Sequence, residues 1–104
     1  MARNIIVSRH PATIELITHS LDTVDQVSHH FDTDDVREGD CIYGNLTAHL
    51  IASVCARGGR YFHIQISLPE SLRGKELSRD QMISLNPKIV EISATVVGVQ
   101  ELNY

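Results

Sequence analysis

The chain has 104 residues, of which 42% are hydrophobic and 21% are charged, and its formal net charge at pH 7 is -4. This length and balance predict one globular domain over residues 1–104 and exclude disordered and fibrous classes. The negative charge disfavours a duplex nucleic acid or an anionic membrane as partner, because such binding needs many basic contacts. No apolar run is long enough for a signal peptide or a membrane span, so we expect a cytoplasmic protein.

The opening stretch from Asn4 to Pro11 has the pattern of a strand, a polar turn and the start of a helix. The β-branched run Ile5 to Val7 favours a strand, and the proline suits the first position of a helix. In α/β sheets ligands bind where such turns lie, and Ser8, Arg9 and His10 bring a hydroxyl, a guanidinium and an imidazole there. We take these three residues as candidate catalytic groups acting on a phosphate. The alternative is that Ser8 or His10 only caps the helix and that Arg9 is solvated.

Hydrophobic periodicity predicts the other elements and a single three-layer, Rossmann-like α/β domain. Its sheet is expected to have about five mostly parallel strands, with one hairpin-like step through the acidic turn at residues 32–40. The expected elements are a helix from Pro11 to about Ser20, a weak strand from Val24 to Phe31, a strand from Cys41 to Tyr43, a helix from Leu46 to Arg57, a strand from Arg60 to Leu68, a short helix from Ser78 to about Leu85 and a final strand from Lys88 to Val99.

Three further features lie near the expected strand ends. The strand, turn and helix layout recurs around Asn45, where His49 projects from the side of its helix opposite the apolar face. We expect His49 to be a surface histidine or to face the same ligand as the first turn. His63 lies on the more polar face of its strand, where we expect a hydrogen-bonded structural residue rather than a catalyst. The basic turn from Arg73 to Lys75 is placed to close over a phosphate.

Nothing in the sequence has the spacing of a metal site, and we expect neither a metal nor a cofactor. The segment from His29 to Asp35 holds five residues of ligand type, but adjacent strand residues point to opposite faces and no zinc or calcium pattern is met. Cys41 and Cys55 do not form a close pair, and both lie in apolar segments where reduced, buried thiols are usual.

Three sequence blocks follow one another in a recognisable order: VSRHP at residues 7–11, GNLTAHL at 44–50 with CARG at 55–58, and LP at 68–69 followed by LRGKELS at 72–78. Together they resemble the small CRISPR-associated accessory family called Csx sixteen, which is found beside type III CRISPR systems. The resemblance covers about residues 5–82, and residues 88–104 match no motif. It implies a dimeric Rossmann-type ring nuclease that linearises cyclic oligoadenylate, in particular cyclic tetra-adenylate, and so ends the antiviral signal.

Such a reaction needs no metal, because a ribose 2′-hydroxyl already lies beside the scissile phosphodiester and attack leaves a 2′,3′-cyclic phosphate. Arg9 would stabilise phosphate charge, Ser8 and the helix amides would position the ligand, and His10 would act as general acid or base. A homodimer would present two copies of this site to a ring with twofold symmetry. The expected ligand-binding residues are Asn45, Thr47, His49, Arg73 and Lys75.

Three other functions remain open at this point. The dimer could sequester cyclic oligoadenylate without cutting it, which binding without turnover would identify. A strand followed by Arg-His is also similar to the histidine phosphatases, although Pro11 stands where that family has glycine and the chain is short for such an enzyme. A purely structural role in a CRISPR complex would leave Arg9→Ala and His10→Ala without effect.

Overall fold

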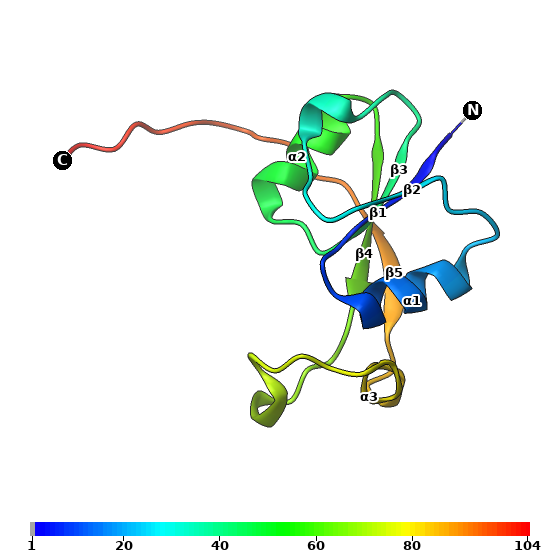
Figure 1. Ribbon diagram of the computed structural model, residues 1–104. Coiled ribbons are helices and arrows are strands. Elements are labelled where there is room, and N and C mark those ends of the chain that lie inside the picture. Colours follow the sequence, from blue (N-terminus) through cyan, green and yellow to red (C-terminus); the bar gives the residue numbers. More distant parts are fainter. Residues whose placement is uncertain (1) are drawn as a thin grey trace.

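Short strands form one mixed sheet in the computed structural model, which describes residues 2–104 (Figure 1). The strand order is β2-β1-β3-β4-β5, with every neighbouring pair parallel except β4 and β5. This confirms the predicted α/β domain with a mostly parallel sheet of five strands. The strands are β1 (Asn4–Val7), β2 (Gln26–Ser28), β3 (Cys41–Gly44), β4 (Arg60–Gln65) and β5 (Lys88–Ile92).

Helices cover both faces of this sheet and make three layers. The α-helices are α1 (Pro11–Ser20), α2 (Ala48–Ala56) and α3 (Arg79–Ser84), and the short 3-10 turns are η1 (Thr33–Asp35) and η2 (Glu70–Leu72). Pro11 begins α1, and the predicted capping box forms between Ser78 and Gln81 of α3.

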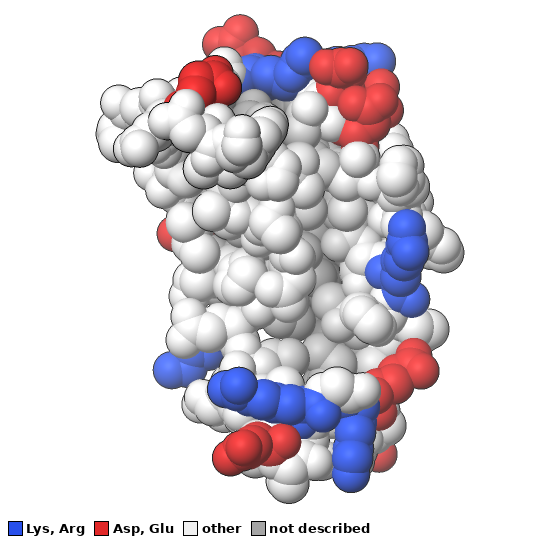
Figure 2. All heavy atoms as spheres, turned by 90° about the vertical axis from the view of Figure 1, so that its left-hand side faces the viewer, with Lys and Arg blue, Asp and Glu red and all other residues white. Residues whose placement is uncertain are grey.

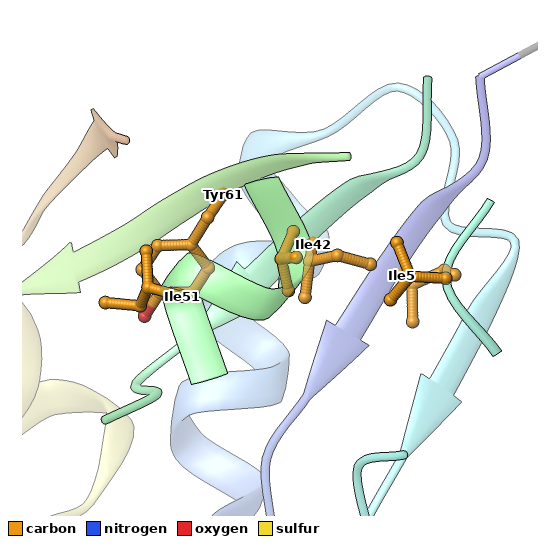
Figure 3. Close-up of a cluster of buried hydrophobic side chains, with 6 residues drawn as sticks. Ile5, Ile42, Ile51 and Tyr61 are labelled. Carbon is orange, nitrogen blue, oxygen red and sulfur yellow. The ribbon is translucent and has the colours of Figure 1, made fainter. Parts of the chain in front are cut away.

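Two apolar clusters, one on each face, hold the layers together. Adjacent residues of β1 divide between them, because successive strand side chains point to opposite faces. On the α2 face the buried residues are Ile5, Val36, Ile42, Ile51, Val54 and Tyr61 (Figure 3). On the face covered by α1 and α3 they are Ile6, Ile17, Cys41, Tyr43, Ile64 and Met82.

The prediction of a hairpin-like step through the acidic turn is wrong. Strands β2 and β3 lie on opposite sides of β1, and both run parallel to it. The segment between them instead crosses the sheet, because Val36 is buried in the α2-side cluster and Asp40 is tied to Arg3. The antiparallel pair is β4 with β5, which are joined through η2 and α3.

Several elements are shorter than the sequence predicts. Strand β2 keeps only three residues, β4 ends before Ile66 and β5 ends at Ile92 rather than Val99. Helix α2 starts at Ala48, because the residue before it, Thr47, has extended backbone torsion angles of φ -73° and ψ 161°. The face of β4 that was expected to be polar contains the fully buried Tyr61, since α2 covers that side of the sheet.

Both cysteines are free thiols, with Cys41 buried and Cys55 half-buried. Among residues 2–104, no His, Cys, Asp and Glu side chains gather in a group of three or more that could hold a metal ion. None of the helices in this part of the chain is long and apolar enough to cross a membrane.

Asp40 anchors the start of β3 and makes folding sensitive to acid. Asp40 is 1% exposed. It accepts from Nε and Nη2 of Arg3 at 3.1 and 2.6 Å and from the backbone N–H of Arg37 at 2.9 Å. The hydrogen-bonded Arg3 guanidinium lowers the pKa of Asp40 in the folded protein. Its stabilising contribution is therefore present above the unfolded pKa of about 3.9 and is lost as the pH falls through the lower, folded value.

Asp40→Asn is expected to reduce the free energy of unfolding near neutral pH by about 2 kcal/mol, because the charged hydrogen bonds are lost. The difference from wild type should shrink as the pH is lowered below the unfolded pKa. Urea unfolding at neutral and acidic pH measures both values. A difference that stays constant with pH would contradict this role for the Asp40 carboxylate.

Candidate functional site

The candidate site lies where β1 and β3 end side by side. Val7 and Gly44 are paired in register, so the turns that follow the two strands open at the same edge of the sheet. A Cβ atom on Gly44 would lie 2.4 Å from the backbone oxygen of Val7. Only glycine therefore allows the two strand ends to approach this closely. The first turn carries Ser8, Arg9 and His10, and the second carries Asn45.

A cleft of about 670 Å³ opens beside these turns. Its volume is in the range of sites that hold small molecules. The residues with polar side chains that line it are Arg9, His10, Thr13, Asn45, Lys75 and Glu76. Its apolar wall is formed by Ile66, Leu68, Leu77 and Met82. With two cations, an imidazole and an amide against one carboxylate, the lining suits an anionic ligand.

A second hollow, of about 350 Å³, lies beside β2 and η1. Asp32, Asp34 and Asp35 all line it, together with Arg3 and Arg37. Three carboxylates would repel a phosphate, so this hollow does not suit the same class of ligand.

Arg9 is held at the cleft by the strand on the other side of β1. Its Nε donates to the backbone oxygen of His29 at 3.0 Å, just beyond the end of β2. That segment is in turn fixed to the first turn, because the backbone N–H of Ser8 donates to the backbone oxygen of Ser28 at 3.0 Å. The two terminal nitrogens of the guanidinium can still donate to a ligand.

His10 occupies the N-cap position of α1, but its side chain makes no capping hydrogen bond. Its ring lines the cleft. The side chain of Ser8 does not line it: the Ser8 hydroxyl oxygen accepts from the backbone N–H of His10 at 3.1 Å. Ser8 therefore shapes the turn that places His10 at the cleft. Neither side chain caps the helix.

The structure brings some of the expected ligand-binding residues to this cleft and leaves others outside it. Asn45 and Lys75 line it, but Thr47, His49 and Arg73 do not. Thr47 and His49 contact each other instead, with 3.3 Å between Oγ1 and Nδ1. His49 is exposed on α2, as its spacing predicts.

Tyr61 and His63 lie beside the second turn. The hydrogen bond predicted for His63 is confirmed, whereas the link from Tyr61 to this turn was not predicted. The Tyr61 hydroxyl donates to the backbone oxygen of Gly44 at 2.9 Å and accepts the backbone N–H of Leu46 at 2.8 Å. It also lies 2.7 Å from Nδ1 of His63. Burial raises the pKa of Tyr61, so this hydroxyl stays neutral. These bonds fix the backbone on both sides of Asn45.

His63 also reaches the site from β4. His63 lines a hollow of about 250 Å³ that shares Asn45, Ile66, Leu68 and Leu77 with the main cleft. The available signal was the position of His63 beside the end of β3, where it pairs in register with Gly44.

Tyr61→Phe is expected to lower the free energy of unfolding by about 2 kcal/mol, because the half-buried N–H of Leu46 and the buried C=O of Gly44 lose their common partner. Tyr43→Phe is the matched control: Tyr43 is also buried, and its hydroxyl makes no hydrogen bond within residues 2–104. Urea unfolding of both variants measures the difference. Equal losses of stability would mean that the Tyr61 hydroxyl does not hold the second turn.

Comparison with protein-family models matches residues 5–95 to the family described as "Putative CRISPR-associated protein (Cas_VVA1548)". The chain belongs to this family. The match runs from β1 past the end of β5 and includes every residue that lines the cleft. It confirms the predicted CRISPR association, while the family description names no activity. No curated protein and no solved structure matches this CRISPR-associated chain.

Proposed function

We propose that this CRISPR-associated protein is a ring nuclease that binds and linearises cyclic oligoadenylate, with cyclic tetra-adenylate as the expected substrate. The observation that carries the proposal is the convergence of Arg9, His10, Asn45 and Lys75 on one cleft at the edge of the sheet. Two cations suit the phosphodiester, and the amide of Asn45 can bond a base or a ribose. The resemblance of the VSRHP and GNLTAHL blocks to ring nucleases supports the same function.

The proposed step is an isomerisation within the ring. A ribose 2′-oxygen attacks the adjacent phosphorus while the bond from phosphorus to the 5′-oxygen breaks, which leaves a 2′,3′-cyclic phosphate and a 5′-hydroxyl. His10 transfers the proton that the 2′-hydroxyl loses or the 5′-oxygen gains. Arg9 and Lys75 stabilise the charge that develops on the phosphorus oxygens. Ser8 acts as a positioning residue, through its bond to the backbone of His10.

The size of the ligand favours two copies of the chain. A ring of four nucleotides is larger than one cleft of about 670 Å³ holds. Its twofold symmetry matches an isologous homodimer, in which the partner would contribute a second set of the same residues.

Incubation with cyclic tetra-adenylate in EDTA, followed by chromatography and mass spectrometry, tests the proposal. We expect wild type to form linear products and His10→Ala to be slower by about 100-fold or more, since proton transfer is lost. His19→Ala is the matched control, because His19 lies exposed at the other end of α1.

Other outcomes separate the remaining functions. A ligand that is bound but recovered intact would identify a protein that sequesters the messenger. Phosphate release from a simple phosphomonoester, without ring opening, would favour the phosphatase. A ligand that is neither bound nor cut would reject the proposed function.

A further inference from the structure

The C-terminal residues 93–104, called here the arm, leave the end of β5 and run away from the domain (Figure 1). They form neither helix nor strand. Only one residue of the arm, Glu101, is charged. Its large apolar side chains are exposed, with Val97 at 99%, and the others are Val96, Val99, Leu102 and Tyr104.

An apolar composition of this kind is typical of a segment that another surface covers when a protein binds its partner. Apolar side chains held in water are unfavourable, and contiguous ones mark interaction surfaces. The residues from Thr95 to Val99 are also mostly β-branched, which is why the sequence predicts a strand up to Val99. Within residues 2–104, however, no strand lies beside them and their backbone groups have no hydrogen-bond partner.

A complementary surface lies at the root of the arm. A hollow of about 340 Å³ there is lined by α2 residues and by the first residues of the arm, mostly through apolar atoms. The α2 residues are Ala52, Ser53, Cys55 and Ala56. Their small side chains allow a neighbouring chain to come close to the helix. Figure 2 shows the side of the molecule to which the arm points: uncharged residues cover its middle, and most acidic and basic side chains gather at its upper and lower margins, with a basic one at its right-hand edge.

We propose that the arm docks on a second copy of this chain, where it lies across α2 and fills this hollow, while the partner's arm does the same in return. Each copy carries both halves of the contact on one side, so a twofold axis can satisfy both at once. Beyond Val96 the arm leads away from its own domain, and residues 97–104 do not line the hollow of their own α2. The arm carries one charged side chain, Glu101, and the α2 residues of the hollow carry none, so little charge repulsion opposes contact between identical copies.

The reach of the arm agrees with this arrangement. Extended chain covers about 3.3 Å per residue, so the arm spans roughly 40 Å. Helix α2 has nine residues and is about 14 Å long. The arm is therefore long enough to cross the partner's helix and to bring its five large apolar side chains against that copy.

Sedimentation equilibrium of the full chain, without nucleotide, tests the proposal. We expect wild type to be a dimer and Val97→Glu to weaken dimerisation about 100-fold, because two charges enter the twofold contact. Val97 is exposed in the single chain, so the variant should keep its fold and thermal stability as a monomer. Ile83→Glu is the matched control, since Ile83 is 48% exposed on α3 and lies outside the arm. It should leave the dimer intact.

Cross-linking then tests where the arm lies. In the variant Val97→Cys, oxidation should join the new thiol to Cys55 of the other copy, and the added change Cys55→Ala should remove that link. A monomeric wild type, or a dimer that Val97→Glu does not weaken, would overturn the proposal, and so would a disulfide that never involves Cys55. The proposal shares the homodimer with the proposed function, but none of these measurements uses cyclic oligoadenylate, so failure of the arm contact is distinguishable from failure of ring opening.

Discussion

Arg9→Ala is expected to slow the opening of cyclic tetra-adenylate about 100- to 1,000-fold, because the proposed transition state loses its main donor to the phosphorus oxygens. Arg9 is the cation of the cleft that the fold itself fixes, through the bond from its Nε to His29. Its effect should therefore exceed that of Lys75, which lies in the exposed turn after η2. Single-turnover rates with saturating enzyme measure the loss directly.

Arg9→Lys is the control that separates charge from geometry. Lysine keeps the positive charge, but it lacks the planar fork that holds two oxygens at once. We expect a rate between those of wild type and Arg9→Ala, while circular dichroism shows that all three proteins are folded. A rate for Arg9→Ala within a few-fold of wild type would remove Arg9 from the reaction.

Gly44→Ala is expected to destabilise the fold by about 3 kcal/mol, as overpacking between rigid backbones does. The added Cβ would lie 2.4 Å from the backbone oxygen of Val7, and a backbone atom cannot move aside as a flexible side chain can. Strands β1 and β3 would have to separate at the edge that bears the cleft. Urea unfolding gives the loss of stability, and the affinity for cyclic tetra-adenylate shows whether the site widens.

Gly98→Ala is the matched control for this prediction. Nothing lies within 4 Å of a Cβ atom built on Gly98, and its φ is not positive. In the monomer, at protein concentrations below the dissociation constant of the proposed dimer, its stability should equal that of wild type. Equal stability of Gly44→Ala and wild type would contradict the close approach of β1 and β3 on which the site depends.

Local sequence was sufficient to predict the first turn and the class of the fold. A β-branched run followed by polar residues and a proline leaves few alternatives to a strand, a turn and a helix. The structure has β1 and α1 at these places, with Arg9 and His10 at the cleft between them. The ends of α3 were also predictable, because the Ser78 capping box marks its start and Pro87 follows its end.

Features that depend on contacts distant in sequence were not predictable in this way. The acidic turn resembles a hairpin connection, and only the burial of Val36 and the ion pair of Arg3 with Asp40 make it a crossover. Tyr61 holds the second turn only because the end of β3 brings Gly44 and Leu46 next to its hydroxyl group. Arg73 and Lys75 are both basic and flank the same glycine, so the sequence does not distinguish them. In the structure the turn at Gly74 brings only Lys75 to the cleft.

The mass of the first product formed from cyclic tetra-adenylate in EDTA tests the central proposal most directly. Attack by the 2′-hydroxyl rearranges the ring without adding any atom, so the linear product should have the same mass as the ring but a different retention time. It should form with wild type and at a strongly reduced rate with Arg9→Ala. A ring that is recovered unchanged, or a first product heavier by one water, would contradict the proposed reaction.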